Sequence, residues 1–277
     1  MKRLPFLLFL AMICTTVLSQ SCFPEGVYFT SQQQIDDFPV NYPDCNRIEG
    51  YVRIEGDDIT NLRGLSQLTS IGGSLWIYRT HPSLNNLSGL ENIQSIGMAL
   101  RIYNTASLTN LAELANLQTL GSGIIIRDNA ALVSLIGLEN LTSIYDLNIR
   151  DNAALVSLKG LENILKIRST CVIKDNGSLK SLEGLNSLEA IVQYFSLTSN
   201  SSLNSLDGLE NLERVGFEFY ILENDALSSI EGLKSLGSVG WWLTIHGNDA
   251  LVSLQGLENL VSVGSGLSIS YNTSLIS

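Results

Sequence analysis

Residues 251–272 read LVSLQGLENLVSVGSGLSISYN, and this pattern recurs along most of the chain. In general form it is L-x-x-L-x-G-L-x-x-L-x-x-I-x-x-x-L-x-I-x-x-N. Its first position returns every 23 to 25 residues, at Ile59, Leu84, Leu108, Leu132, Leu155, Leu179, Leu203, Leu227, Leu251 and Leu275. A glycine–leucine pair keeps the same register and loses its glycine only at Glu113-Leu114. A fixed period of this length is typical of proteins built from stacked repeats.

Each copy of the pattern predicts one coil of a solenoid. Segments such as Leu100-Arg101-Ile102 alternate apolar and polar residues, as half-buried strands do. The leucines around the glycine recur at every third position, which favours a short 3₁₀ or helical return. One asparagine per coil is expected to turn inward and bond to the backbone: Asn129, Asn152, Asn176, Asn200, Asn224, Asn248 and Asn272. We therefore predict a mainly β, right-handed parallel β-solenoid of about nine coils of 24 residues, stabilised by coil stacking.

Residues 1–20, MKRLPFLLFLAMICTTVLSQ, have the basic start and short apolar run of a secretory signal peptide. No run in the chain is long enough to predict a transmembrane segment. Cys22 and Cys45 stand close together after this leader, and a disulfide is their simplest pairing in an exported protein. The alternative is a lipoprotein with an acylated Cys22. We expect the protein to be secreted or held on the outer cell surface.

The repeat resembles the receptor L domain, the ligand-binding solenoid of insulin-type and epidermal-growth-factor-type receptors, within the leucine-rich-repeat class. The best matching stretches are Gly89–Asn104, Gly137–Asn152 and Gly256–Asn272, and the resemblance covers about residues 48–277. Similar repeats occur in bacterial secreted and cell-surface proteins, and the segment from Cys22 to Cys45 is similar to the N-terminal cap of that group. The resemblance implies an N-terminal cap at 21–47 followed by L-domain-like repeats at 48–277.

Composition excludes several classes of function. The 277 residues include 16 Lys and Arg against 27 Asp and Glu, a net charge of −11, which disfavours nucleic acid as a partner. The only histidines, His81 and His246, lie about seven coils apart and cannot share a metal ion or a catalytic dyad. We interpret the glutamates of the G-L-E-N motif as a solvated convex face rather than a calcium site. We predict no catalytic residue, no bound metal and no cofactor.

The outward strand positions vary from coil to coil, while the rest of the repeat is monotonous. The candidate ligand-binding residues at these positions are Trp76, Tyr78, Arg101, Tyr103, Arg127, Arg150, Lys174, Tyr220, Trp242 and His246. The first four form an aromatic and basic cluster, and the next three continue it as a positive stripe. Tyr220 and Trp242, together with Tyr194, form a second aromatic group. Arginine and aromatic residues are common anchors of recognition surfaces, although cross-strand pairs that merely stabilise a sheet have the same composition.

These patterns predict a secreted or cell-surface recognition module. It would bind an extracellular protein or an acidic glycan through its strand face, without catalysis. The alternative is a structural spacer or adhesin stalk that presents another domain. The chain ends in the middle of a repeat at Leu275-Ile276-Ser277, so we also expect either end-to-end self-association or a C-terminal extension.

Overall fold

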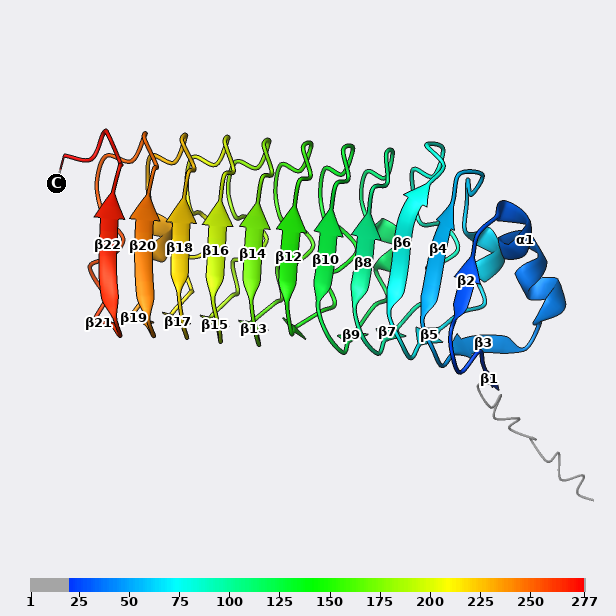
Figure 1. Cartoon of the computed structure of the whole chain (residues 1–277). Helices are drawn as coiled ribbons and strands as arrows, with labels where there is room; N and C mark the ends of the chain where they lie inside the picture. The colour runs from blue at the N-terminus through cyan, green and yellow to red at the C-terminus, as the bar shows by residue number, and fades with distance from the viewer. Residues whose placement is uncertain (1–19, 277) are drawn as a thin grey trace, which may run out of the picture.

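Eleven parallel strands lie side by side and form the long face of the molecule, the main sheet (Figure 1). In this computed structural model, which describes residues 20–276, they are β2 (Val27–Phe29), β4 (Val52–Gly56), β6 (Leu75–Thr80), β8 (Leu100–Tyr103), β10 (Ile124–Arg127), β12 (Leu147–Arg150), β14 (Cys171–Lys174), β16 (Phe195–Thr198), β18 (Phe219–Leu222), β20 (Trp242–His246) and β22 (Gly266–Ser270). The prediction of a mainly β parallel solenoid is confirmed, with about ten turns and a 24-residue spacing.

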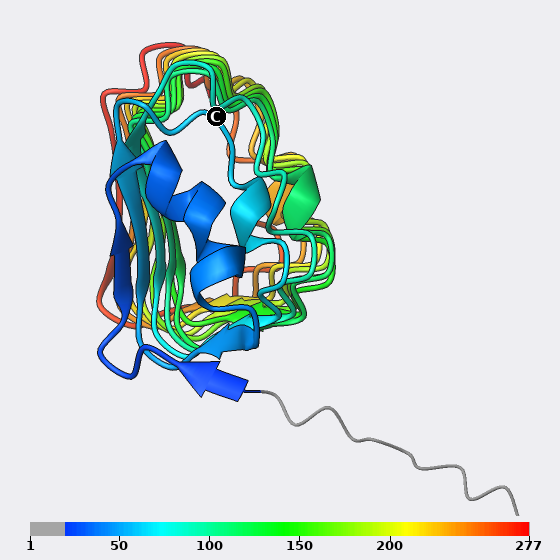
Figure 2. The same ribbon diagram turned by 90° about the vertical axis from the view of Figure 1, so that its right-hand side faces the viewer.

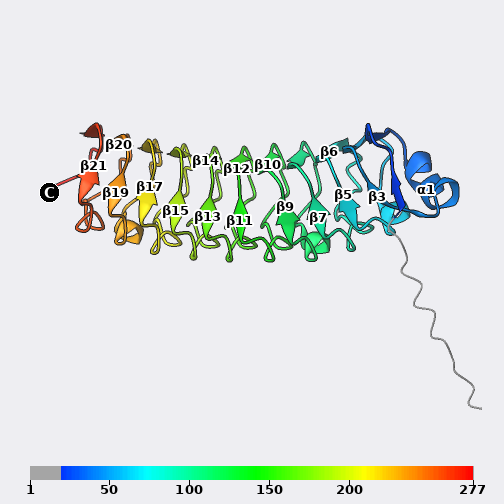
Figure 3. The same cartoon turned by 90° about the horizontal axis from the view of Figure 1, so that it is seen from below.

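Two further parallel sheets of short strands run along the base of the solenoid (Figure 3). The first contains β1 (Gln20–Cys22), β3 (Cys45–Ile48), β5 (Ser70–Ile71), β7 (Ser95–Ile96) and β9 (Thr119–Leu120). The second contains β11 (Ser143–Ile144), β13 (Lys166–Ile167), β15 (Ala190–Ile191), β17 (Arg214–Val215), β19 (Ser238–Val239) and β21 (Ser262–Val263). The end-on view shows the main sheet as one wall, these short strands at the base and the returns opposite the main sheet (Figure 2).

The returns take two forms. Within the described residues, three coils contain a 3₁₀ helix, namely η1 (Arg63–Leu65), η2 (Ala112–Leu114) and η3 (Glu231–Leu233). Six other coils turn at a glycine with positive φ, such as Gly160 with φ of 113°. The single coil without this glycine has Glu113 inside η2, where the chain does not take the left-handed turn. The predicted short 3₁₀ returns therefore occur in three coils, and a glycine turn replaces them in most others.

The solenoid interior is a continuous stack of aliphatic residues. The repeat leucines and isoleucines are almost all fully buried, and Phe195 stacks on Phe219 with ring centroids 4.7 Å apart. Cys171 fills the inward strand position beside Leu147 and is also fully buried. At the C-terminal end, Leu254, Leu257 and Leu260 are only partly buried against this core. Stability thus depends on contacts between neighbouring coils, as in other repeat proteins.

A buried ladder of asparagines runs along the end of the main strands, as the sequence predicts. In each coil the backbone N–H and the Nδ2 group donate to Oδ1 of the next asparagine, for example from Asn152 to Asn176 at 3.2 Å. Nδ2 also donates to a backbone carbonyl of the preceding coil, as Asn176 does to Ile149 at 3.1 Å. In the coil before Asn129 the ladder position is occupied by Thr105, which is buried and bonds to Asn129. Asn104, the asparagine of the repeat pattern in that coil, is instead exposed and adopts a left-handed turn.

The N-terminal residues close one end of the solenoid (Figure 2). Helix α1 (Gln32–Asn41) begins at Ser31, whose side chain accepts from Gln34 N–H, and buries Ile35 and Phe38. A disulfide joins Cys22 to Cys45 and so links strands β1 and β3 of this cap. The predicted disulfide is confirmed. The predicted signal peptide at 1–20 lies outside the described residues except for Gln20.

Candidate ligand-binding face

The main sheet brings the candidate residues onto one face in two columns. Parallel pairing aligns Trp76 with Arg101 in the first column. It aligns the second column in consecutive strands, in the order Tyr78, Tyr103, Arg127, Arg150 and Lys174. Their neighbours in the strands are buried, so these side chains alternate outward along each strand. Seven of the ten candidates therefore lie on five neighbouring strands.

Aromatic rings and guanidinium groups are interleaved at the N-terminal part of this face. We call Arg53, Trp76, Tyr78, Arg101, Tyr103 and Arg127 the aromatic–cation cluster. The Cζ atom of Arg101 lies 4.8 Å from the Trp76 ring centroid, and that of Arg127 lies 4.5 Å from the Tyr103 centroid. The rings of Tyr78 and Tyr103 meet edge to face at 6.4 Å. Stacking of this kind holds each guanidinium plane while leaving its polar edge able to bind a planar anion.

Three residues that the sequence analysis did not select adjoin these candidates, namely Tyr28 of the N-terminal cap and Arg53 and Glu55 of β4. Tyr28 Oη donates to Glu55 Oε2 at 2.6 Å, and Arg53 Nε donates to the same oxygen at 3.0 Å. The Tyr28 hydrogen bond, helped by Arg53, lowers the pKa of Glu55. Arg53 also lies over the Tyr28 ring, with Cζ 5.0 Å from the centroid. Glu55 therefore fixes Arg53 beside Trp76 and extends the cluster onto strand β2.

Each cation of the predicted positive stripe has an acidic neighbour. Arg127 Nε lies 3.8 Å from Asp128 Oδ2, and Lys174 Nζ lies 3.5 Å from Asp175 Oδ2. The third aspartate, Asp151, follows Arg150 directly and occupies the same left-handed turn position. Desolvation, and then the charges of Asp175 and Asp128, raise the pKa of Asp151. Arg127 and Lys174 of the stripe are thus ion-paired, and Arg53 of the aromatic–cation cluster is paired with Glu55, so Arg101 is the cluster guanidinium that forms no ion pair in the described part of the chain.

Comparison with known proteins gives one match. Residues 44–133 match the family model of the receptor L domain. This match and the parallel β-solenoid together fit a receptor L domain-like solenoid. No curated protein and no solved structure matches it. The matched segment ends six residues after Arg127 and includes all six residues of the aromatic–cation cluster.

The receptor L domain match indicates a ligand-binding module with a non-enzymatic type of fold. The match and the Cys22–Cys45 disulfide together point to an extracellular or surface location. Residues 20–276 contain no helix with the length and apolar character that a membrane crossing needs.

Replacing Asp151 by asparagine should stabilise the L domain-like solenoid at neutral pH. The folded state raises the Asp151 pKa, so the ionised carboxylate disfavours folding, and this penalty grows as pH rises through the unfolded-state pKa. Asparagine removes the charge and tolerates the φ of 55°. We expect Asp151→Asn to add about 0.5 kcal/mol at neutral pH. Thermal unfolding should show no gain near pH 3, and a variant less stable than the parent at neutral pH would contradict the argument.

The three remaining candidates lie at the C-terminal part of the L domain-like face. Tyr220 is half-buried, and desolvation, with a smaller effect of the Glu218 charge, raises its pKa. His246 Nδ1 lies 2.9 Å from Ser270 Oγ, and the His246 ring contacts Tyr271 at 5.0 Å. Trp242 is exposed at the start of β20. Among the described residues no ring contact joins Tyr194, Tyr220 and Trp242, so they are separate side chains on one surface.

Unpaired polar atoms concentrate on the same face. Five buried side-chain nitrogen or oxygen atoms in the described part of the chain have no hydrogen-bond partner. Four of them belong to outward strand residues, namely Trp76 Nε1, Arg101 Nε, Asn148 Oδ1 and Arg150 Nε. Buried polar groups without partners are uncommon and costly in folded proteins. Most of the buried side-chain polar atoms that lack a hydrogen-bond partner in the described chain therefore lie on the strand face.

The return side of the L domain-like solenoid uses its carboxylates structurally. The glutamate of each G-L-E-N motif accepts from the glycine N–H two residues earlier, as Glu258 does from Gly256 at 2.8 Å. The following asparagine donates to a carbonyl of the preceding coil, as Asn163 does to Glu139. These glutamates are exposed or half-buried at the surface, and their carboxylates also close the turn.

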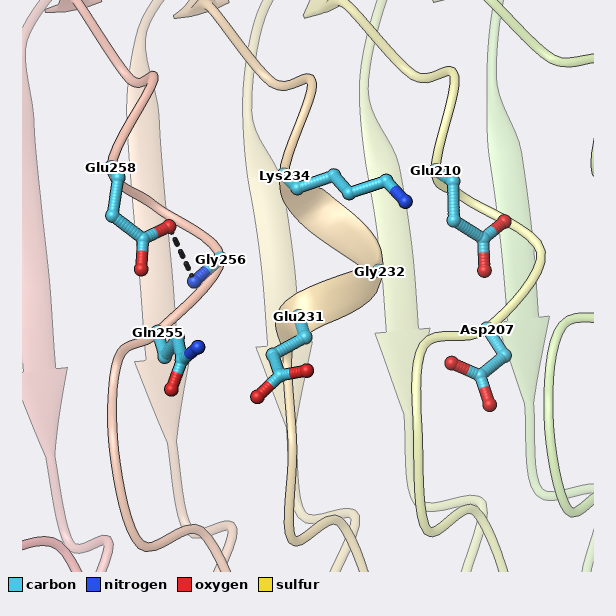
Figure 4. Close-up of a pocket in the computed structure, with 8 residues that line it drawn as sticks. All are labelled: Asp207, Glu210, Glu231, Gly232, Lys234, Gln255, Gly256 and Glu258. Carbon is cyan, nitrogen blue, oxygen red and sulfur yellow. Dashed lines mark hydrogen bonds between the residues drawn. The ribbon is translucent and has the colours of Figure 1, made fainter.

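A shallow hollow of about 250 Å³ lies on this return side (Figure 4). Its lining is acidic, with Asp207, Glu210, Glu231 and Glu258 around a single lysine, Lys234. Glu210 and Glu258 are already bonded to glycine N–H groups. Within residues 20–276 no three His, Cys, Asp or Glu side chains are grouped as a metal ion requires. The hollow gives no support to a metal or catalytic site.

Proposed function

We propose that the protein is a secreted or cell-surface recognition module that binds an extracellular protein or acidic glycan through the aromatic–cation cluster. The observation that carries the proposal is the placement of Arg101 and Arg127 over Trp76 and Tyr103 on a strand face. Arginines held by aromatic rings are suited to bidentate contact with carboxylate or sulfate groups. The rest of the molecule is strongly acidic, so an anionic ligand would be directed to this region.

The proposal includes no catalytic step. The one free cysteine among the described residues, Cys171, is fully buried, and burial raises the pKa of its thiol. The two histidines have separate surroundings, because His81 Nδ1 accepts from Ser83 N–H whereas His246 lies beside Ser270. A recognition role is therefore better supported than an enzymatic one.

Substitutions in the aromatic–cation cluster should weaken ligand binding without lowering the stability of the folded protein. We expect Trp76→Ala combined with Arg127→Glu to reduce retention on a sulfated-glycan matrix, and on immobilised extracellular proteins, by at least about tenfold. Both side chains are outward, so thermal unfolding should change little. The matched control is Tyr145→Ala with Lys166→Glu, which removes an exposed ring and reverses an exposed charge away from the cluster.

The salt dependence gives a second readout. Retention through the cluster should fall as salt rises from low to moderate concentration, because exposed charges are screened. Equal loss of binding in the control, or a matching loss of stability in the cluster variant, would show that the aromatic and arginine pairs serve only to stabilise the sheet.

A spacer or adhesin stalk is the second candidate. It is favoured by the regularity of the rod, in which ten main strands from β4 to β22 follow one another in parallel (Figure 1). A well-folded protein that binds nothing on either matrix would support this role.

A further inference from the structure

Three large aromatic side chains are exposed at the corner where the chain passes from the base of the solenoid into the main sheet. Phe217 precedes β18, Trp241 precedes β20, and Trp242 is the first residue of β20. Their exposed fractions are 49%, 46% and 42%. We call these residues the corner platform. The chain segments that carry it, from β17 to β18 and from β19 to β20, run along the lower edge of the main sheet in Figure 1, toward the end opposite α1.

The rings of the corner platform are held in place. Trp241 N–H donates to the Phe217 carbonyl at 3.1 Å, and the two rings meet edge to face with centroids 6.4 Å apart. The Trp242 ring lies against Gly266 in the next coil, where an added Cβ would be 2.5 Å from Cζ3. Rings that are packed on one side and open on the other lose little entropy on binding. Neighbouring exposed aromatic side chains are a common feature of interaction sites.

The surroundings of the corner platform are polar, and the nearest cation before it in the sequence is Arg214 of β17, three residues before Phe217. Backbone bonding places Gln193 and Ser265 in the same column as Phe217 and Trp241, one coil to either side. In the preceding coil, the position equivalent to Trp242 is occupied by Glu218. The segments 217–222 and 241–246 contain no lysine or arginine. These segments therefore offer an anionic glycan or lipid headgroup no cation of their own and one carboxylate, Glu218, whereas amide, hydroxyl and carboxylate groups can bond to sugar hydroxyls.

We propose that the corner platform binds a neutral glycan, with its rings stacked on sugar rings. An aromatic face offers an apolar surface that matches the C–H face of a pyranose, and the nearby polar side chains can orient the hydroxyls. This site differs from the aromatic–cation cluster in position and in ligand charge. It goes beyond the proposed function, and either site can be present without the other.

The distribution of tryptophan allows the two sites to be observed separately. The chain has three tryptophans, of which Trp76 belongs to the cluster and Trp241 and Trp242 belong to the corner platform. In Trp76→Phe, tryptophan emission reports only on the corner platform. In Trp241→Phe/Trp242→Phe, it reports only on the cluster. The probes are cellohexaose and chitohexaose as neutral glycans, a sulfated oligosaccharide, and phosphatidylcholine vesicles.

We expect Trp76→Phe to show a saturable emission change with a neutral hexaose at up to millimolar concentration. Adding Trp241→Ala and Phe217→Ala should weaken that binding by at least about tenfold, read by calorimetry. Tyr145→Ala is the matched control, because Tyr145 is an exposed ring in the same corner column three coils before Phe217. It should leave the affinity unchanged.

Three outcomes would overturn the proposal. They are no emission change with either neutral glycan, neutral-glycan binding that survives loss of the corner rings, and a response to vesicles alone. Sulfated-glycan binding reported by Trp76 in Trp241→Phe/Trp242→Phe tests the proposed function independently, so failure of one site is distinguishable from failure of the other.

Discussion

Gly160→Ala is expected to lower the free energy of unfolding by about 3–5 kcal/mol. Gly160 has φ of 113°, a backbone conformation that residues with a Cβ rarely adopt. An added Cβ would also overlap the carbonyl oxygen of Leu135 in the preceding coil. Both effects act at the interface between coils, which is the source of stability in a solenoid. Urea unfolding followed by circular dichroism measures the loss.

Gly177→Ala is the matched control for this substitution. Gly177 has no positive φ, and an added Cβ would meet only Ser201 Oγ, at 3.7 Å. We expect this variant to be within about 0.5 kcal/mol of the parent, or slightly more stable, because alanine reduces the entropy of the unfolded chain. If the two variants unfold at the same urea concentration, the glycine turn does not constrain the return.

The sequence predicts the features that every coil needs. The leucine ladder and the buried asparagines follow from the repeat, because each has the same environment in every turn. The turn geometry was less predictable. Asp128, Asp151 and Asp175 each precede a ladder asparagine, and Asp-Asn dipeptides at that period are a signal for a left-handed turn. That turn places an aspartate beside each cation of the stripe, which a list of strand residues does not show.

The parts of the surface that lie outside the strand motif could not be predicted from the period. Tyr28 comes from the cap, which has no repeat, and reaches the cluster only because β2 pairs with β4. Phe217 and Trp241 occupy a corner position filled by Ser169 and Gln193 in other coils. No fixed residue type occupies that position, so only the fold shows that these two aromatic rings meet.

Asn176→Ala is expected to destabilise the protein by about 4 kcal/mol. The Asn176 side chain is fully buried and donates to the carbonyl oxygens of Ile149 and Lys174 and to Asn200 Oδ1. Its own Oδ1 accepts from both the N–H and the Nδ2 group of Asn152. Alanine would remove the acceptor of the Asn152 N–H and the Nδ2 donor of the Ile149 and Lys174 carbonyls, whereas Asn152 Nδ2 keeps its bonds to Ile126 and Arg150. Each buried group left unpaired costs about 1–3 kcal/mol. Urea unfolding gives the total loss.

Where along the solenoid the Asn176→Ala variant loses stability is as informative as the size of the loss. Coils contact only their neighbours, so hydrogen exchange should quicken first in β12, β14 and β16, and later toward both ends. Asn163→Ala is the matched control, because Asn163 is exposed and makes one bond, to the Glu139 carbonyl at 2.8 Å. It should cost about 1 kcal/mol. Equal losses in the two variants would mean that the ladder adds no more than an ordinary surface bond, whereas a large local loss at Asn176 identifies the ladder as the polar link that joins successive coils.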